Sequence, residues 1–290
     1  MTSASRFVLL PLLSAAVCAA RAEAVHDAPD GPKGHDKSGY NLFNPVPADL
    51  MREMVTDRPD TTESPITVDA GHFQIEASIV DFNRDKSRGV STETWSFGQV
   101  NLKAGLLDRT DIQFVFDSYV RRRTRVAGTT TTVAGVSDLT VRLKQNLWGV
   151  DGDTRTACAL MPWFSAPTGV DGISAEKYQG GLIAPLSVEL ADGVGLGAMV
   201  QGDILWDGAK YYMEWTHSAT FGFAITEDVG MYVEYVGVHD SGTASNYRAY
   251  GDVGVTVAAN ANLVFDTGVR VGLNARADDI GIFTGISYRY

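Results

Sequence analysis

Residues 138–148 read Asp-Leu-Thr-Val-Arg-Leu-Lys-Gln-Asn-Leu-Trp, and apolar and polar side chains alternate through most of this stretch. Leu139, Leu143 and Leu147 share one parity, whereas Arg142 and Lys144 share the other. Successive side chains of a β-strand point to opposite faces, so the stretch predicts a strand with one apolar and one charged face.

The same alternation recurs from residue 66 to the end of the chain. Twelve segments of roughly 10–15 residues show it, each bounded by turn-forming residues: 68–82, 91–106, 110–122, 136–148, 154–166, 179–190, 194–207, 211–226, 229–239, 247–259, 263–273 and 279–290. Short connections alternate with longer ones, notably 123–135 and 167–178. The pattern predicts an all-β fold, a transmembrane antiparallel up-and-down β-barrel of about 12 strands.

Periodicity alone does not say which face points inward. Strands of about 10 residues suit a tilted crossing of the hydrocarbon layer, whereas strands of soluble sandwiches are nearer 5–6 residues. With the export signal described below, this length favours apolar side chains outside and charged ones in the lumen. The net charge of −11 disfavours a nucleic-acid partner.

The N-terminus has the features of an export signal. Arg6 precedes the apolar run 7–20, and Ala20-Arg21-Ala22 fits a small-x-small cleavage site. We expect residues 1–22 to be a signal peptide, 23–65 a Pro-rich linker with a possible periplasmic plug, and 66–290 the barrel. A short helix is expected within residues 47–55.

The last segment indicates the destination of the chain. Ile280, Ile282, Ile286, Tyr288 and Tyr290 share one face, and the chain ends on an aromatic residue. Such a strand is typical of outer-membrane barrels, where the insertion machinery recognises it. We expect the cell outer membrane as the location. The expected partners are its lipids, lipopolysaccharide near the basic cluster 121–125, the insertion machinery and a small-molecule solute. For that cluster, solvated loop charge is the alternative.

Residues 56–76 (TDRPDTTESPITVDAGHFQIE), with 41–45 (NLFNP) and 50–53 (LMRE) upstream, resemble the start of a known family. This is the MetA-pathway phenol-degradation family of exported, outer-membrane transporter-like β-barrels. The specific part of the resemblance covers about residues 41–76, and the rest depends on the barrel pattern. It implies the fold and location, and uptake of small, often aromatic, molecules.

Four charged residues stand in a short, proline-bounded stretch just before the first predicted strand: Asp57, Arg58, Asp60 and Glu63. We expect this stretch to fold into or across the periplasmic mouth and to pair with lumen charges as a plug or constriction. The alternative is a solvated leader.

Alternation along each strand also assigns candidate lumen-lining residues. The basic candidates lie on the earlier segments, and the acidic ones lie on later segments: Lys103, Arg121, Arg142, Lys144 and Arg155, then Glu189, Asp203, Glu214, Glu234 and Asp252. An acidic wall predicts mild cation selectivity. Alternatively, these groups pair with one another and fill the lumen.

The sequence therefore predicts an outer-membrane channel for passive uptake of small solutes, among them aromatic compounds. A closed structural or surface-interaction barrel and an outer-membrane hydrolase are the alternatives. No catalytic, cofactor or metal site is predicted. His217 and Ser218 are adjacent and so point to opposite faces of a strand, which prevents a direct nucleophile–base pair.

Overall fold

A computed structural model describes residues 36–87, 89–241 and 246–290. The predicted signal peptide and the linker up to residue 35 lie outside the described residues. Among those described, no helix is long and apolar enough to cross a membrane.

The described chain is almost entirely β-structure after a short 3₁₀ helix, η1, at Ala48–Leu50. The strands are β1 (Phe73–Ser87), β2 (Val90–Leu107), β3 (Thr110–Val126), β4 (Thr129–Gly135), β5 (Leu139–Trp148), β6 (Thr156–Ala166), β7 (Gln179–Ala191), β8 (Val194–Trp206), β9 (Tyr211–Ala224), β10 (Val229–Asp240), β11 (Asn246–Asn260), β12 (Leu263–Gly272) and β13 (Ile280–Arg289). Most exceed the about 10 residues that a tilted membrane strand needs.

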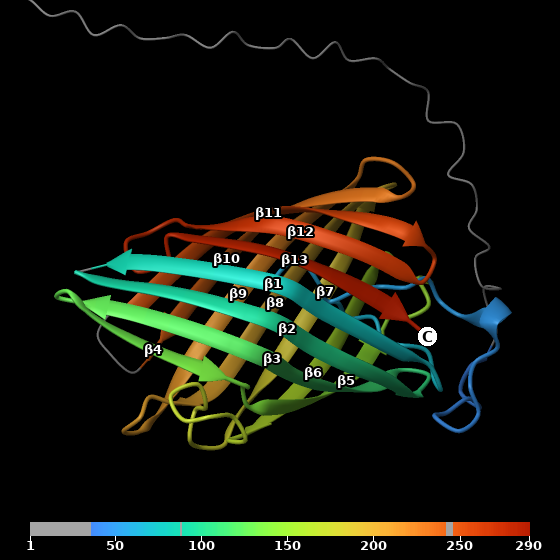
Figure 1. Cartoon of the computed structure of the whole chain (residues 1–290). Helices are drawn as coiled ribbons and strands as arrows, with labels where there is room; N and C mark the ends of the chain where they lie inside the picture. Colours follow the sequence, from blue (N-terminus) through green and yellow to red (C-terminus); the bar gives the residue numbers. More distant parts are fainter. Residues whose placement is uncertain (1–35, 88, 242–245) are drawn as a thin grey trace, which may run out of the picture. The chain divides into compact units, whose positions relative to one another are not determined.

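Consecutive strands pair antiparallel, and the first strand closes the sheet. β1 pairs with β2 on one side and β13 on the other, while β3 pairs with both β2 and β5 (Figure 1). β4 pairs with the far half of β3 and extends that hairpin beyond the ring. The result is a closed 12-strand barrel plus one hairpin strand, which confirms the predicted fold class.

The two ends of the barrel differ in their connections. One end, here called the turn end, carries the C-terminus and the tight connections 108–109, 192–193 and 261–262 (Figure 1). The other, the loop end, carries the β3–β4 hairpin and the connection 167–178.

Side-chain exposure shows which face is outside. Leu143, Val200 and Val255 are exposed, together with most large hydrophobic residues of the strands, whereas Lys144 and Asp203 are buried. Closure satisfies the strand hydrogen bonds, and an apolar outer surface of this extent suits lipid rather than water. The apolar-out orientation expected from the sequence is what the barrel has.

Three details differ from the sequence prediction. The first strand runs 73–87 rather than 68–82, because residues 68–72 lead into the barrel from the N-terminal side. The stretch 123–135 continues β3 and forms β4, with the turn at Ala127 and Gly128 in the left-handed region that favours glycine. The predicted helix within 47–55 is reduced to η1.

Candidate functional site

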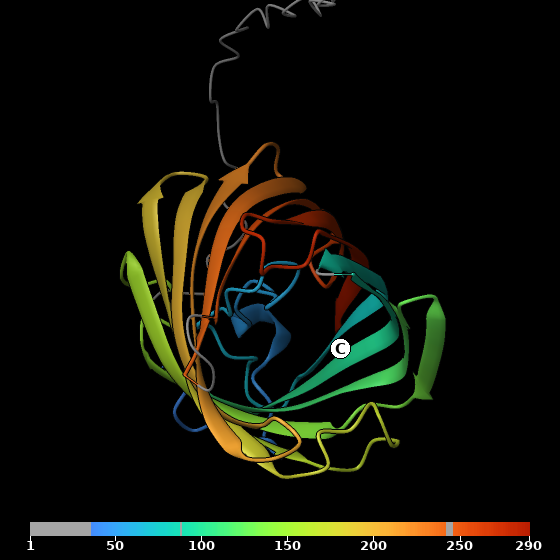
Figure 2. The same cartoon turned by 90° about the vertical axis from the view of Figure 1, so that its left-hand side faces the viewer.

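The candidate site is the turn end of the barrel, where residues 36–72 lie at the mouth and partly inside it (Figure 1, Figure 2). These residues are called the N-terminal segment below. Val46, Leu50 and Ala70 pack together in a small buried cluster, with Tyr40 and Met51 against it. The ring Nε2 of His72 lies 2.8 Å from the carbonyl oxygen of Val46. The segment thus has its own apolar anchor beside the start of β1.

Asp57 occupies a buried position between two strands. The Lys144 ammonium of β5 donates to its Oδ1 and Oδ2 at 2.7 and 2.9 Å, and Lys103 of β2 donates to Oδ2. Its backbone N–H donates to Glu76 on β1 at 3.1 Å. Burial raises the pKa of Asp57, but the two ammonium groups outweigh this and hold it well below its usual range.

Arg58 contacts the wall formed by β1, β12 and β13. Its Nε and Nη2 donate to the two carboxylate oxygens of Asp266 on β12 at 3.1 and 2.8 Å. Its Nη1 donates to the hydroxyl of Ser78 on β1. The guanidinium lies over Gly285 of β13, where a Cβ would come within 2.4 Å of Nη2. A bidentate pair fixes both the position and the orientation of the arginine.

Glu63 is the third charged contact of the segment. Its Oε1 accepts from Nη1 of Arg142 on β5 at 2.6 Å. Burial raises the pKa of Glu63 to about 7, although Arg142 acts in the opposite direction. This acid therefore titrates near neutral pH.

Residues 60–62 meet the acidic wall formed by β10 and its neighbours. The backbone N–H groups of Thr61 and Thr62 donate to the two carboxylate oxygens of Glu234 at 2.8 Å each. Arg270 donates to the Thr61 hydroxyl at 2.8 Å and also pairs with Asp252 at 2.7 Å. Burial, followed by the charge of Glu234, raises the pKa of Asp60 well above its usual range.

A further charged cluster at the turn end was missed by the sequence reasoning. Arg52 pairs with Asp69 at 3.2 Å, with Asp151 at 2.9 Å and with Asp108. Arg289, the last residue of β13, donates to the Arg52 carbonyl at 2.7 Å. These partners come from the segment, two turns and the final strand. Their spacing in sequence gives no signal that they meet.

The structure separates the ten candidate lumen residues into three groups by exposure. The five buried residues are Lys103, Lys144, Asp203, Glu234 and Asp252. The two half-buried residues are Arg142 and Glu214, and the three exposed ones are Arg121, Arg155 and Glu189. Of the buried ones, Asp203 accepts hydrogen bonds from Trp163 Nε1 at 2.9 Å and from Gln201. Glu214 pairs with Arg248 on β11.

The position of Arg121 differs from the prediction because the alternation reverses partway along three strands. Gln99 lies opposite the buried Ser78. Trp95 is four residues from Gln99 and pairs with Phe82, which in turn pairs with Ile282 on β13. Ile282 is exposed on the outer face, so Phe82 and Trp95 are on the outer face as well. Gly98, between Trp95 and Gln99, has a φ of 60°, and β1 has a bulge between residues 78 and 80. Arg121 pairs with Trp95 and is therefore on the outer face.

The lumen also contains an apolar patch that the sequence reasoning did not identify. Met161 on β6, Ile183 on β7 and Met199 on β8 form a buried cluster, with Trp163 packed against it. These residues occupy the inward parity, which was expected to be polar throughout. The signal in the sequence was that Met199 has the same parity as Asp203 on β8, so both side chains point inward.

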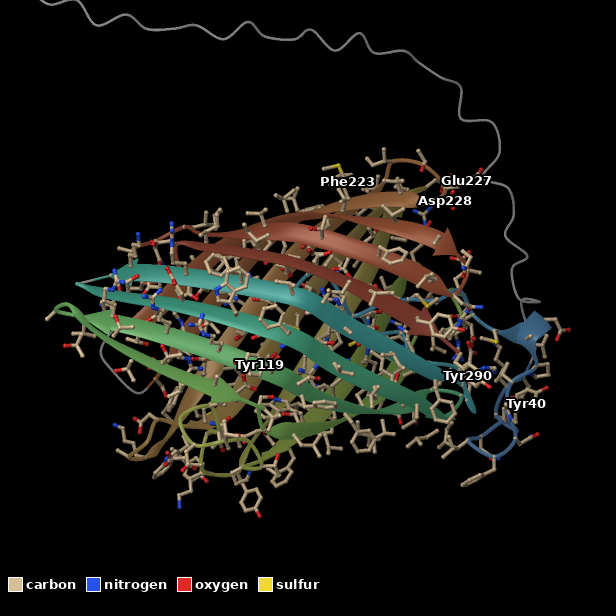
Figure 3. The ribbon with its side chains drawn as sticks, in the orientation of Figure 1. Tyr40, Tyr119, Phe223, Glu227, Asp228 and Tyr290 are labelled. Carbon is tan, nitrogen blue, oxygen red and sulfur yellow. The ribbon has the colours of Figure 1, made fainter. Side chains whose placement is uncertain are left out.

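Two hollows lie along the wall formed by β9–β13 and β1. One of about 430 Å³ opens at the turn end between Arg58–Asp60 and strands β9–β12, and Tyr232 is part of its lining. Phe223, Glu227 and Asp228, which are labelled in Figure 3, are also among its lining residues. The other, of about 520 Å³, is at the loop end beside the connection 273–279.

His217 lies on the outer surface, where its Nε2 is 3.2 Å from the Tyr247 hydroxyl and its ring stacks on Tyr247. In the part of the chain that the structure describes, no three His, Cys, Asp or Glu side chains are grouped to hold a metal ion. The site is therefore a set of ion pairs and hydrogen bonds between the N-terminal segment and the barrel wall.

Solved structures with a similar fold are outer-membrane barrels. The COG4313 outer membrane channel from Pseudomonas putida F1 aligns over 81% of this chain and 100% of its own, with a TM-score of 0.59 and 11% identity. The translocator domain of the autotransporter NalP from Neisseria meningitidis aligns over 76% and 88%, with a TM-score of 0.51 and 10% identity. At such identities the likeness shows the fold. No curated protein matches the sequence.

A closed barrel with an apolar outer belt can satisfy its backbone in lipid, and this chain is an outer-membrane β-barrel. The model of the family described as "Putative MetA-pathway of phenol degradation" matches residues 56–290, from the charged stretch of the N-terminal segment through the final strand. That span includes every strand of the barrel, and the chain belongs to this family.

Proposed function

We propose that the protein is an outer-membrane channel for passive uptake of small solutes, with the N-terminal segment as its constriction. The observation that carries this proposal is the mode of attachment: residues 57–63 contact the wall through ion pairs and hydrogen bonds. A segment bound in this way is separable from the wall without exposing a large apolar core. Asp57, Arg58, Asp60 and Glu63 are the proposed constriction residues.

The solute route that fits best follows the wall of β9–β13, where hollows open at both ends. This wall carries the Arg270–Asp252 pair and the Thr61 hydroxyl bound to it, and Tyr232 lines the hollow at the turn end. We propose that a solute crosses past these groups. Their fixed charges orient dipolar molecules, because charged side chains that line a pore influence its selectivity.

The proposed solutes are small molecules with an aromatic or apolar part. The family description refers to phenol degradation, and a structural neighbour is described as an outer membrane channel. The patch formed by Met161, Ile183 and Met199 adds an apolar surface to an otherwise charged lumen. Polar and apolar walls together suit amphipathic solutes better than ions or hydrocarbons.

The turn end is proposed to face the periplasm, because short turns lie on that side in outer-membrane barrels. The alternating strand β13, with Tyr288 exposed near its end, is proposed as the signal that the insertion machinery reads. Lipopolysaccharide is the proposed partner at the loop end.

The second candidate is a closed structural or surface-interaction barrel. It is favoured by the pairing of lumen charges, since Asp252 pairs with Arg270, Glu214 with Arg248 and Asp266 with Arg58. Charged side chains that neutralise one another in pairs can fill a closed lumen, and they can equally line an open solute path. A hydrolase has no such support, because His217 lies on the outer face beside tyrosines.

Solute flux into proteoliposomes separates these candidates. Benzyltrimethylammonium and benzoate are suitable probes because they are aromatic and their charge prevents rapid passage through lipid. A channel with the proposed acidic excess admits the cation faster than the anion. If neither solute enters through the wild type or through a folded variant lacking residues 41–62, the barrel is closed and the channel proposal is wrong.

A further inference from the structure

The outer face of β1–β3 at the loop end carries an unusual concentration of positive charge. Three rows of residues cross these strands on one face, as the register shows: Phe82, Trp95 and Arg121; Arg84, Glu93 and Arg123; Lys86, Ser91 and Arg125. Five are cationic and one is acidic, in a chain whose net charge is −11. This set is called the basic patch below.

The basic patch faces the membrane rather than the lumen. Phe82 lies opposite Ile282, which is 47% exposed, and Trp95 is 36% exposed. Residues 84 and 86 on β1, and 121, 123 and 125 on β3, share the face of Phe82 and Trp95 by alternation. Arg121 and Arg125 are exposed. The reversal at Gly98 is what places these cations outside.

Aromatic rings lie along the edge of the basic patch that is nearer the turn end, and Phe82 and Trp95 belong to its first row. Trp95 stacks near Phe97 with ring centroids 6.2 Å apart, and Phe82 is 4.5 Å from Trp95. Phe97 in turn lies 6.3 Å from Tyr119, which Figure 3 shows on β3. Aromatic side chains of this kind mark the membrane–water interface of outer-membrane barrels. The cations are therefore at headgroup level.

Internal pairing leaves most of this charge available. Glu93 is the acid in the three rows, and it lies 3.9 Å from Arg123. The neighbouring β4 supplies Thr130 and Thr132 opposite Arg125 and Arg123, which adds hydroxyl groups beside the cations. Arginine is well suited to bind phosphate oxygens through two parallel hydrogen bonds.

We infer that the basic patch is a binding site for the phosphate groups of lipopolysaccharide, with acyl chains against the ring set Phe82, Trp95, Phe97 and Tyr119. The inference rests on the proposed orientation, with the loop end outside. Charge complementarity selects the occupant, because the outer leaflet is where a lipid with several phosphates meets a barrel. Single-phosphate lipids offer less charge to five cations.

The test uses the full-length protein in detergent, with labelled rough lipopolysaccharide and the same material after chemical dephosphorylation. We expect the wild type to bind the phosphorylated form about tenfold more tightly, as two charge-assisted hydrogen bonds would allow. Arg121→Gln/Arg123→Gln should lose that preference. Arg121→Lys/Arg123→Lys should keep most of it. Arg109→Gln/Lys210→Gln, which removes two exposed cations elsewhere, should bind as the wild type does.

Equal binding of the two lipopolysaccharide forms by the wild type would overturn the inference. So would an unchanged affinity in the glutamine variant that retains the heat-modifiable gel mobility of a folded barrel. Equal affinity for phosphatidylglycerol would replace lipopolysaccharide with anionic lipid in general. Conductance in a bilayer without lipopolysaccharide tests the channel proposal independently, so failure of one proposal is distinguishable from failure of the other.

Discussion

Lys144 on β5 is fully buried inside the barrel, and its ammonium lies 2.7 Å from the carboxylate of Asp57 in the N-terminal segment. Lys103 on β2 meets the same carboxylate and also pairs with Glu76. Two buried cations from different strands thus share one carboxylate, and this carboxylate belongs to the N-terminal segment rather than to a strand of the barrel. The fold of the barrel and the position of the segment are coupled through this residue.

Substitution Asp57→Asn should release the N-terminal segment. It leaves Lys144 and Lys103 without their shared carboxylate, and removing one partner of a buried ion pair typically costs about 3–5 kcal/mol. We expect faster protease cleavage within residues 41–62 and a larger single-channel conductance. Asp49→Asn, at an exposed position of the same segment, is the control. Equal cleavage rates in both variants would contradict the role given to Asp57.

Gly285→Ala tests the Arg58 contact without changing any charge. A Cβ at residue 285 would come within 2.4–2.6 Å of three guanidinium atoms of Arg58, so the side chain must move away from Asp266. Because the end of an arginine is flexible, the barrel should fold while the contact is lost. We expect higher conductance than in the wild type. Gly195→Ala, whose Cβ would lie 3.9 Å from its nearest neighbour, the Val188 carbonyl oxygen, should leave conductance unchanged.

The attachment of the segment should weaken as pH rises through neutrality. Burial raises the pKa of Glu63 from 4.5 to about 7, so the docked segment holds this proton more tightly than the released one. Protonation of Glu63 therefore favours docking, and this favourable contribution decreases as the pH rises from 4.5 to about 7. Each unit of such a shift corresponds to about 1.4 kcal/mol.

Conductance measured at pH 5 and pH 8 checks this pH dependence, and the higher value is expected at pH 8. Glu63→Gln removes the titrating group and should flatten much of the difference. Asp60 shifts in the same direction, so Asp60→Asn/Glu63→Gln should flatten it further. The lowered pKa of Asp57 places its effect below pH 4, outside this window. Lower conductance at pH 8 in the wild type would show that the sign is wrong.

Asp203→Asn should shift selectivity toward anions and leave the segment in place. Asp203 is buried on the inward face of β8 and its partners are the neutral groups of Trp163 and Gln201. Its negative charge therefore acts on the lumen without a bonded cation. Glu234→Gln differs, because Glu234 also binds the backbone of Thr61 and Thr62. Reversal potentials in a salt gradient measure both, and an unchanged value for Asp203→Asn places that residue off the conducting path.

Most of the barrel follows from alternation, as β5 and β8 illustrate. Leu139, Leu143 and Leu147 are exposed and Lys144 is buried, as the pattern of residues 138–148 predicts. A two-residue alternation of apolar and polar side chains is expected when one face of a strand contacts lipid and the other faces a polar lumen. It fails where a bulge reverses the faces, and Arg121 was assigned to the lumen for that reason.

The candidate site was less accessible from sequence. The charged stretch 57–63 could be recognised as unusual, but its partners Lys144, Glu234 and Asp266 are brought to it only by closure of the barrel. Pairing across a lumen depends on strand register and tilt, which single-residue patterns do not encode. The inward apolar cluster around Met161 was missed because inward positions were assumed to be polar.

The central claim is that the barrel conducts and that the N-terminal segment constricts it. The most direct measurement is single-channel conductance in planar bilayers of the wild type and of a folded variant lacking residues 41–62. We predict a small steady conductance for the wild type and a severalfold larger one for the deletion. Equal conductance would show that the segment does not constrict the path, and the absence of current from both proteins would contradict the channel itself.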